Sequence, residues 1–590
     1  MVKDRLKDLR DLMLKYNIDA YIVPTSDPHQ SEYIADYYKT RKYISGFTGS
    51  AGTFVITNNK AGLWTDGRYF IQATKELDGS GIDLYKMGVE GTPTIIEFLN
   101  SEVEENGIVA FDGETYSYSA YLDLKKGLKN KKILSDRDLI GEIWKNRPSK
   151  PMDKIFLHDV NYAGITAKEK IAKVKDFMEK NNIDYYLLSS LDDISYLLNI
   201  RGLDVDYNPV IISYVLINKD KTTLFVDLKK VDKNIIENLK LNGVEVDEYE
   251  IIFEELKNLN STKTIYFNPS RVNVKLFNSL PENINKKTGI DFTTNMKAVK
   301  NTIEIKNQRN AYIKDGVALV KFLNWVEENV SSNNEITEMD CSRRLLEFRK
   351  EQELFIEPSF ETISAYGENA ALPHYSPSDR SPVYLRSKGL YLVDSGGQYL
   401  DGTTDITRTI ALGDVTEEES LHYTLTLKSH IRLMLAIFKK GTKSSALDII
   451  ARQPLWEKGI DFNHGTGHGV GYFLACHEGP QNISPRSNNI NMVPGMITSN
   501  EPGVYIEGSH GIRIENIMLC IDKFQTNFGE FYGFESLSLC PIDTKPVIKE
   551  LLTSEEIQWL NEYHNRCYEE LSKYLNGEEL EYLKEKTKVI

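Results

Sequence analysis

Acidic residues that could bind metal ions occur in two short stretches of the C-terminal half of this 590-residue chain. In the first stretch, the apolar residues 391–393 lead into Asp394, a glycine-rich turn follows, and a threonine-rich segment carries Asp405. Folding this stretch as a hairpin places Asp394 and Asp405 on neighbouring strands, within reach of a shared cation. A single aspartate beside a turn, such as Asp401 before Gly402, usually serves the turn itself. The pair of acids on facing strands is what indicates a binding site.

The second acidic stretch covers residues 499–516. Gly508 and Gly511 mark a turn between two strands, and period-two alternation then places Arg513 and Glu515 on one side of the returning strand. Glu515 stands in an otherwise apolar run, where a buried carboxylate without a partner is costly. Glu515 is therefore either paired with a cation, for example with Arg513, or bound to a metal ion.

Three histidines, His464, His468 and His477, lie within fourteen residues between these two stretches. Four glycines among residues 464–471 argue against a helix, which excludes the paired-histidine helix face of HExxH zinc proteases. The segment also lacks the Lys-Ser/Thr ending of a phosphate-binding loop. A lone histidine is usually structural, but three of them beside so many glycines favour a site.

The candidate metal ligands combine four carboxylates with one imidazole: Asp394, Asp405, His468, Glu501 and Glu515. This set is too rich in oxygen for a structural zinc site, which prefers Cys and His. Four negative charges match two divalent ions, between which a bridging hydroxide can form near neutral pH. Ligand hardness favours Mn(II), and Co(II), Fe(II) or Zn(II) are the alternatives.

The elements that precede this half read as an α/β unit used twice. Three features recur in the same order, and each copy reads as a helix, a strand, a loop and a strand pair. The matching pairs are residues 16–22 with 181–187, residues 43–49 with 196–202, and the runs that end at Asp66 and Asp227.

Two seams divide the chain. Residues 144–151 have a linker composition with two prolines, and a long helical pattern begins after residues 295–298. Residues 553–556 have the spacing of a capping box for a last helix. We therefore expect three domains with these boundaries: residues 1–147, 148–297 and 298–590.

Composition narrows the class of protein. The net charge of −15 shows no basic footprint for nucleic acid, and the five cysteines show no CxxC spacing. Such sparse cysteine use fits a reducing compartment, so we expect the cysteines to play no part in the chemistry. Apolar runs stop short of the roughly 18 residues of a membrane helix, and the N-terminus has no secretory apolar core. We expect a soluble cytoplasmic protein that binds neither membrane nor nucleic acid.

These motifs resemble those of the Xaa-Pro aminopeptidases, within the pita-bread metallopeptidase family. The resemblance covers essentially the whole chain. It implies two tandem creatinase-like α/β domains, as in the long, three-domain cytosolic form, followed by a C-terminal α+β pita-bread catalytic domain. The segments that carry it are residues 64–70, 394–399, 401–408, 464–471, 477–480, 501–503, 513–516 and 559–564.

The resemblance implies that the five candidate ligands hold a di-Mn(II) centre bridged by Asp405 and Glu515. The implied reaction removes an N-terminal residue that precedes proline, with a hydroxide bridging the two ions as the nucleophile. Glu501 would act as the general base for that water. His374 and His477 would steady the developing oxyanion and the leaving group.

The remaining implied roles concern substrate binding and assembly. His464, beside His468, would form part of the proline pocket, and Arg513 would orient Glu515 or neighbouring ligands. Tyr505 would lie near the leaving group, and Arg68 would reach the substrate from the N-terminal domain. The implied partners are peptides with proline in second position and a second copy of the chain, joined through the C-terminal domains.

Several other functions would use a related fold. A prolidase shares the ligand set but prefers dipeptides, and residues 477–480 together with the duplicated N-terminal half favour the aminopeptidase. A methionine aminopeptidase would not need some 300 residues before its catalytic domain. Histone-chaperone subunits and creatinase-like hydrolases resemble the fold without the ligands, and all five ligands are present here.

Overall fold

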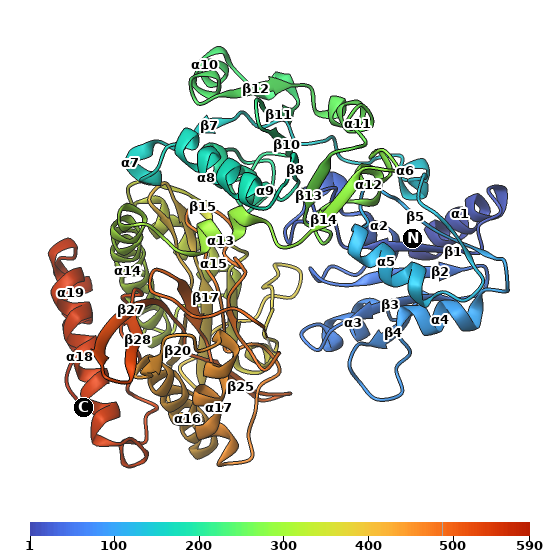
Figure 1. The fold of residues 1–590 in the computed structure, drawn as a ribbon. Coiled ribbons are helices and arrows are strands. Elements are labelled where there is room, and N and C mark those ends of the chain that lie inside the picture. Colours follow the sequence, from blue (N-terminus) through green and yellow to red (C-terminus); the bar gives the residue numbers. More distant parts are fainter. Residues whose placement is uncertain (487) are drawn as a thin grey trace. The chain divides into compact units, whose positions relative to one another are not determined.

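The computed structural model describes residues 1–486 and 488–590. It consists of two units, which are drawn in Figure 1. Unit 1 comprises Met1–Val160 and Ile165–Thr293, and unit 2 comprises Asn161–Gly164 and Thr294–Ile590.

Unit 1 begins with a six-stranded sheet in the order β4-β3-β2-β1-β5-β6. Only β2 runs antiparallel to its neighbours. The strands are β1 (Ala20–Pro24), β2 (Thr53–Thr57), β3 (Ala61–Thr65), β4 (Asp83–Lys86), β5 (Ile108–Phe111) and β6 (Lys132–Leu134). The helices are α1 (Val2–Lys15), α2 (Thr40–Ser45), α3 (Phe70–Glu76), α4 (Ile95–Glu102), α5 (Tyr118–Gly127) and α6 (Leu139–Ile143).

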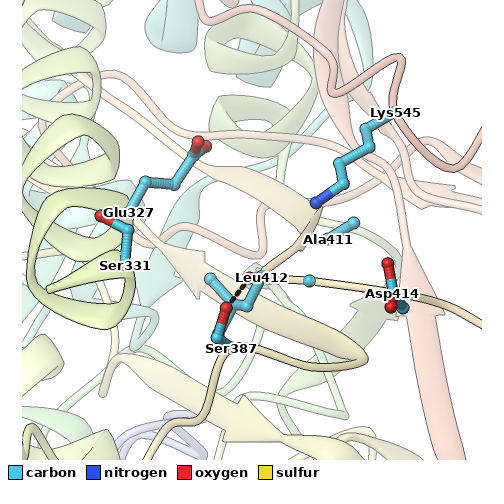
Figure 2. Close-up of a pocket in the computed structure, with 8 residues that line it drawn as sticks. Glu327, Ser331, Ser387, Ala411, Leu412, Asp414 and Lys545 are labelled. Carbon is cyan, nitrogen blue, oxygen red and sulfur yellow. Dashed lines mark hydrogen bonds between the residues drawn. The ribbon is translucent and has the colours of Figure 1, made fainter. Parts of the chain in front are cut away.

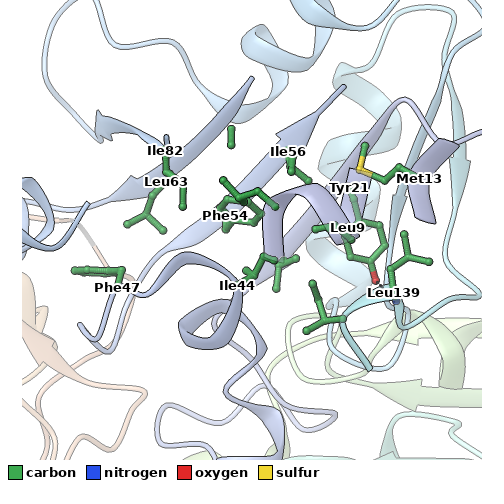
Figure 3. Packing of buried hydrophobic residues seen from close by; sticks show 14 of the residues in the cluster. Leu9, Met13, Tyr21, Ile44, Phe47, Phe54, Ile56, Leu63, Ile82 and Leu139 are labelled. Atoms are coloured by element: carbon green, nitrogen blue, oxygen red, sulfur yellow. Dashed lines mark hydrogen bonds between the residues drawn. The ribbon is translucent and has the colours of Figure 1, made fainter. Parts of the chain in front are cut away.

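Helix α1 shows why this segment folds as it does. Its apolar residues recur at helical spacing, so that Leu6, Leu9 and Met13 are buried while the charged residues face solvent. Figure 3 shows Leu9 and Met13 in the same core as Phe54 and Leu63 of the sheet. Burial of each such side chain contributes about 1.5–3 kcal/mol.

The second sheet of unit 1 repeats the same topology in the order β12-β11-β10-β8-β13-β14. Strand β10 is the antiparallel member, as β2 is in the first sheet. The strands are β8 (Tyr185–Leu188), β10 (Ser213–Asn218), β11 (Thr222–Val226), β12 (Val244–Asp247), β13 (Thr264–Phe267) and β14 (Asn285–Thr288). The helices are α8 (Ala167–Lys180), α9 (Leu191–Leu198), α10 (Lys233–Leu241), α11 (Ile252–Lys257) and α12 (Val274–Asn278). The predicted duplication is therefore confirmed.

The repeated Asn-Ile-Asp motif has one local structure in both copies. Asn17 and Asn182 follow their helices with φ of 54° and 51°, a left-handed conformation that asparagine tolerates. The Asp19 carboxylate then accepts the N–H of Ile108 at 2.7 Å, and the Asp184 carboxylate accepts that of Thr264 at 2.9 Å. The motif thus turns the chain out of the helix and ties the first strand to the next parallel strand.

Unit 2 is an α+β fold built from antiparallel strand groups and longer helices. The strands are β15 (Phe355–Pro358), β16 (Ile363–Tyr366), β17 (Leu390–Ser395), β18 (Gly397–Tyr399), β19 (Gly402–Thr403), β20 (Ile406–Ala411), β21 (Phe438–Lys439), β22 (Gly467–His468), β23 (Asn482–Ile483), β24 (Ile497–Asn500), β25 (Gly503–Ile506), β26 (His510–Arg513), β27 (Asn516–Thr526) and β28 (Gly529–Ser536). The helices are α14 (Thr302–Ser331), α15 (Glu338–Lys350), α16 (Glu417–Met434), α17 (Asp448–Trp456), α18 (Ser554–Leu571) and α19 (Gly577–Lys586).

Two helix starts in unit 2 follow from capping residues. Asn301 accepts the N–H groups of Ile303 and Glu304 and so begins α14. Thr553 and Glu556 form the predicted capping box at the start of α18. The apolar faces of α14, α16 and α18 contribute to one core.

The seams agree in part with the elements. Residues 144–151 form no helix or strand, and α13 (Phe292–Ala298) ends where the second seam was expected. The three domain boundaries themselves stay predictions. Across the part of the chain that the structure describes, no helix combines the length and the apolar character needed to span a membrane.

Candidate metal centre

Two paired strands position the first two candidate ligands. Strands β17 and β20 run antiparallel, with Asp394 opposite Thr407, and Asp405 lies one residue before β20. The side chains of both strands are buried, which agrees with their apolar and threonine-rich sequences. Asp394 and Asp405 are buried at the same end of this pair, at 7% and 4% exposure.

A second strand pair positions the two glutamates. Strands β24 and β27 pair with Asn500 opposite Asn516. Glu501 follows Asn500 and Glu515 precedes Asn516, so the two glutamates stand side by side at the end of the pair. The hairpin β25–β26 links them.

One sequence interpretation of this hairpin was wrong. Gly508 lies in its turn with φ of +72°, but Gly511 lies inside β26. A Cβ on Gly511 would clash with the carbonyl oxygen of Ala370. Gly511 therefore serves a close approach of backbone segments and does not mark the turn.

His468 connects the two carboxylate pairs. Its Nε2 lies 3.4 Å from Oδ2 of Asp405 and 3.5 Å from Oε1 of Glu501. Its Nδ1 lies 2.9 Å from the carbonyl oxygen of Gly469. Because a carbonyl only accepts, Nδ1 carries a proton, which leaves Nε2 as the nitrogen that would bind a metal ion.

The cluster has the chemistry of a cation site. One ligand atom each from Asp405, His468 and Glu515 lie within 4.8 Å of one another. Among the described residues, Oδ1 of Asp394 and Oε1 of Glu515 are buried and have no hydrogen-bond partner. Buried carboxylate oxygens normally have partners, and hard divalent cations prefer such oxygens together with imidazole. The residues present therefore fit a divalent metal centre.

The acids strongly perturb one another. Burial, together with the neighbouring carboxylates, raises the pKa of Glu515 well above its usual value. Burial also raises the pKa of Asp394, against the opposing effect of Arg513. Burial would raise the pKa of Asp405 too, but His468 and His477 outweigh it and leave that pKa lowered. Bound cations would relieve this repulsion.

Arg513 fixes two of these carboxylates. Its Nη2 lies 2.6 Å from Oδ2 of Asp394, and its Nε donates to the hydroxyl of Thr407 at 3.2 Å. That hydroxyl in turn donates to Oε2 of Glu515 at 2.7 Å. Arg513 thus contacts Asp394 directly and Glu515 through Thr407, a residue that the sequence did not single out.

A hydrogen-bonded chain leads from Arg513 to His464. Arg513 Nη1 donates to the hydroxyl of Tyr505 at 2.7 Å, and that hydroxyl lies 2.8 Å from Nε2 of His464. His464 Nδ1 lies 2.8 Å from the carbonyl oxygen of Gly465, so Nε2 is the acceptor for Tyr505. Burial raises the pKa of Tyr505 to about 12, which keeps the hydroxyl protonated.

The other two histidines of interest lie on loops beside this network. The ring of His477 stands perpendicular to that of His468, with 4.2 Å between the ring centres. His374 follows Pro373, whose carbonyl accepts from Arg513 at 3.4 Å. The structure thus brings the loops of both histidines to the residues that surround the acids.

Cys476 contacts a candidate ligand, and the expectation that the cysteines play no part in the chemistry stays a prediction. All five cysteines are free and buried, but the thiol of Cys476 donates to Oδ2 of Asp405 at 3.2 Å. Nothing in its spacing to other cysteines marked it. Its position one residue before His477 was the only available signal.

Arg68 belongs to unit 1, and its predicted approach to the substrate stays a prediction. Its guanidinium forms a two-point ion pair with Asp66, with both N–O distances 2.8 Å. Arg68 and Asp66 line a cavity of about 470 Å³ together with Thr25, Ser50 and Trp64.

Unit 2 contains another cavity, of about 440 Å³, that holds none of the candidate site residues. Figure 2 shows Glu327 and Lys545 on its walls, with Ser387 donating to the carbonyl of Leu412 at 3.4 Å. It is lined by Glu327, Ser331, Ser387, Ala411, Leu412, Gly413, Asp414 and Lys545.

Comparisons with known proteins identify the domain families that this chain resembles. Residues 306–522 match metallopeptidase family M24 and residues 530–590 match its C-terminal region. Residues 5–143 and 146–304 each match the creatinase/prolidase N-terminal domain. The fold and the site thus define a metallopeptidase of the M24 class.

Full-length relatives narrow the class. Aminopeptidase P2 of Arabidopsis thaliana is 40% identical, over 98% of this chain and 87% of its own. Xaa-Pro aminopeptidase 1 of Dictyostelium discoideum is 40% identical, over 100% of this chain and 96% of its own. The solved X-prolyl aminopeptidase of Caenorhabditis elegans, described as a cytosolic enzyme with a di-nuclear active site, covers 100% of both chains at 34% identity and a TM-score of 0.96. This chain belongs to the Xaa-Pro aminopeptidase family, and the predicted family and fold class are confirmed.

Proposed function

We propose that this chain is a metal-dependent aminopeptidase that removes the N-terminal residue of peptides with proline in second position. The observation that carries the proposal is the buried cluster of Asp405, His468 and Glu515, with ligand atoms within 4.8 Å, in a chain 40% identical to relatives named for this activity. A binding protein with this fold would have no need to keep such mutually repelling acids together.

Five residues would hold two divalent ions, Mn(II) by preference: Asp394, Asp405, His468, Glu501 and Glu515. The partnerless oxygens of Asp394 and Glu515 support this assignment. When bound, the ions supply Lewis acidity and make a water acidic enough to ionise near neutral pH. Asp405 and Glu515 would contribute to holding both ions, in line with their place beside His468 in the 4.8 Å cluster.

Glu501 would accept the proton of the attacking water. Ser499 donates its hydroxyl to Oε1 of Glu501 at 3.0 Å and orients the carboxylate. Burial raises the pKa of Glu501, against the opposing effects of His468 and Arg513. His468 Nε2 lies 3.5 Å from Oε1 of Glu501, so the proposed base adjoins the other proposed metal ligands.

The histidines would bind the substrate and stabilise its reacting groups. A prolyl amide has no N–H, so the carbonyl oxygen and the leaving nitrogen are the groups left to bind. His374 and His477 would donate hydrogen bonds to the developing oxyanion and the leaving group. His464, fixed by Tyr505 and Arg513, would line the proline pocket beside His468.

Further parts of the proposal concern the setting of the enzyme. Arg68 would reach the substrate from the N-terminal domain, and its place on the wall of a 470 Å³ cavity supports this role. We propose a homodimer through the C-terminal domains and a cytoplasmic location, in line with the relative from Caenorhabditis elegans that is described as cytosolic. Nucleic acid and membrane are not proposed as partners.

Cleavage of peptides of graded length tests the proposal. Purified protein loaded with Mn(II) should release the first residue from Xaa-Pro-Yaa tripeptides, and Glu501→Gln should abolish the release while the fold is retained. Hydrolysis of Xaa-Pro dipeptides alone would instead identify a prolidase. Metal analysis of the loaded protein should find two ions per chain, and no bound metal would overturn the proposal.

A further inference from the structure

A buried ion cluster contains Glu478, the residue that follows His477 in the chain. The carboxylate of Glu478 is 1% exposed and faces two lysines that are themselves buried. Lys297 Nζ lies 3.0 Å from Oε2 of Glu478, and Lys300 Nζ lies 2.6 Å from Oε1. The lysine side chains are 6% and 1% exposed.

Stability alone does not account for such a cluster. Burying three charged groups carries a desolvation penalty that well-packed apolar residues avoid, so a buried ion pair is weak evidence of a stabilising role. The geometry is instead suited to fixing a backbone position. Lys300 Nζ also donates to the carbonyl of Lys297 at 2.7 Å, and the Lys300 N–H donates to the carbonyl of Gly495 at 2.9 Å. Lys300 is thus fixed to the backbone by its Nζ and its N–H, in addition to its ion pair with Glu478.

Glu478 links this ion cluster to His468 and His477. Its backbone N–H donates to the carbonyl of Gly469 at 2.7 Å. The same carbonyl accepts from His468 Nδ1 at 2.9 Å, the bond that sets the tautomer of that ring. His477, one residue before Glu478, stands against the ring of His468 at 4.2 Å. The Gly469 carbonyl and the anchored Glu478 carboxylate therefore fix the distance between the imidazoles of His468 and His477.

We infer that Lys297 and Lys300 are positioning residues for the peptidase reaction, which act by anchoring Glu478 and so hold the imidazole of His477 in place beside His468. This inference rests on the proposed function, because it assigns to His477 the hydrogen bond to the reacting groups. The ion pairs of both lysines described above are to Glu478, and their proposed effect passes through the two-residue segment 477–478.

Variants of the lysines test the inference on the full-length, Mn(II)-loaded protein. Lys300→Met should lower kcat on an Xaa-Pro-Yaa peptide by roughly 10- to 100-fold, the size expected for a displaced catalytic group, while KM and bound metal change little. Lys300→Arg should restore most of the rate, because it keeps a cation for Glu478. Lys297→Met, which leaves the shorter ion pair intact, should show a smaller loss and serves if Lys300→Met does not fold.

A coupled variant distinguishes positioning from general destabilisation. His477→Ala should lower kcat by itself, and adding Lys300→Met to it should lower kcat no further, because both act through one imidazole. The matched control is Lys428→Met. Lys428 lies 2.7 Å from Glu556, another buried glutamate of unit 2 that a second cation also contacts. This control should lower the melting temperature and leave kcat unchanged.

Two results would overturn the inference. One is a full additional loss when Lys300→Met is combined with His477→Ala, and the other is an equal fall in kcat for Lys428→Met. These results are distinct from failure of the proposed function, in which wild-type protein would release no residue from the peptide. A wild type that is active and sensitive to His477→Ala but indifferent to both lysine variants would retain the function and refute the positioning role.

Discussion

Replacement of Arg408 by lysine tests how hydrogen bonds fix strand β20, which follows the candidate ligand Asp405. Arg408 is 1% exposed and lies on β20, three residues after Asp405. It donates to the Glu515 carbonyl at 2.6 Å, the Asn516 side chain at 2.7 Å and the Tyr563 hydroxyl at 2.8 Å. Its guanidinium also reaches three further backbone carbonyls, those of Thr407, Cys540 and Pro541.

The expected loss follows from counting donors. Lysine offers three N–H groups against five in arginine, and its single nitrogen cannot span acceptors on three chain segments. Some acceptors keep another partner, since the Cys540 carbonyl also accepts from Tyr563 at 2.9 Å and the Thr407 carbonyl from the Glu515 N–H at 3.1 Å. Two to three acceptors lose their donor, each at about 1–3 kcal/mol. Arg408→Lys should therefore reduce the free energy of unfolding of unit 2 by roughly 2–9 kcal/mol.

Chemical denaturation of the metal-free protein measures this loss. Peptide-resolved hydrogen exchange should show the largest increase in exchange rate at β27. Arg408 bonds to Asn516, which begins this strand, and to Glu515, which precedes it. Arg309→Lys is the matched control. Arg309 is 42% exposed and pairs with Glu535 at 2.7 Å, so its replacement should change stability by at most about 1 kcal/mol.

Equal stability losses for the two variants would refute this reasoning. The exposed Arg309–Glu535 pair and the buried Arg408 hydrogen bonds would then contribute equally to the free energy of unfolding. A loss at Arg408→Lys without faster exchange at β27 would also contradict it. In that case the guanidinium would stabilise the protein by its charge and not by the acceptors it joins.

Three further predictions concern the site and the pH dependence of stability. Thr407→Val removes the hydroxyl that Glu515 accepts at 2.7 Å, and should weaken Mn(II) binding by about 10- to 100-fold in a chelator competition assay. Gly469→Ala places a Cβ against the Glu478 carbonyl oxygen, and should lower kcat by roughly 100-fold. Burial lowers the pKa of His564 to about 4, so the unfolded chain, with a pKa near about 6.5, binds more protons between these values. The contribution of this residue to stability should therefore fall by about 3 kcal/mol as pH drops from about 6.5 to 4, and denaturation at several pH values measures it.

Each of these predictions has its own control. Thr403 and Thr407 are both buried threonines, but Thr403 bonds to Gln398, so Thr403→Val should leave Mn(II) affinity unchanged. Gly479→Ala should be tolerated, because among the described residues other than its two chain neighbours no atom lies within 4 Å of its added Cβ. His564→Gln should flatten the pH dependence. Unchanged Mn(II) affinity in Thr407→Val, an active Gly469→Ala or an unaltered slope in His564→Gln would contradict the respective prediction.

Local features of this protein could be predicted from its sequence because local interactions determine them. The Asn-Ile-Asp turns of unit 1 depend on one left-handed asparagine and one aspartate, both visible in the sequence. The pairing of β17 with β20 follows from the apolar run before Asp394 and the threonine-rich run around Asp405, although β18 and β19 lie between the two strands. The capping box of α18 needs only four residues.

Long-range contacts could not be predicted in the same way. Glu501 and Glu515 stand together because β24 pairs with β27, whereas the hairpin seen in the sequence merely links them. Lys297 and Lys300 meet Glu478 across some 180 positions, and lysines near a helix end usually face solvent. Only the folded backbone brings these charges together.

The spread of the proposed ligands along the chain, from position 394 to position 515, also determines when metal can act during folding. An unfolded chain of this length holds no preformed site, because closing such a loop carries an entropic penalty before any ligand is shared. The ions would then bind only to the native state and stabilise it by mass action, so that the apparent stability of unit 2 rises with the logarithm of free metal concentration. The supply of metal in the cell would thereby govern how long this unit survives unfolding and proteolysis as well as how fast it works.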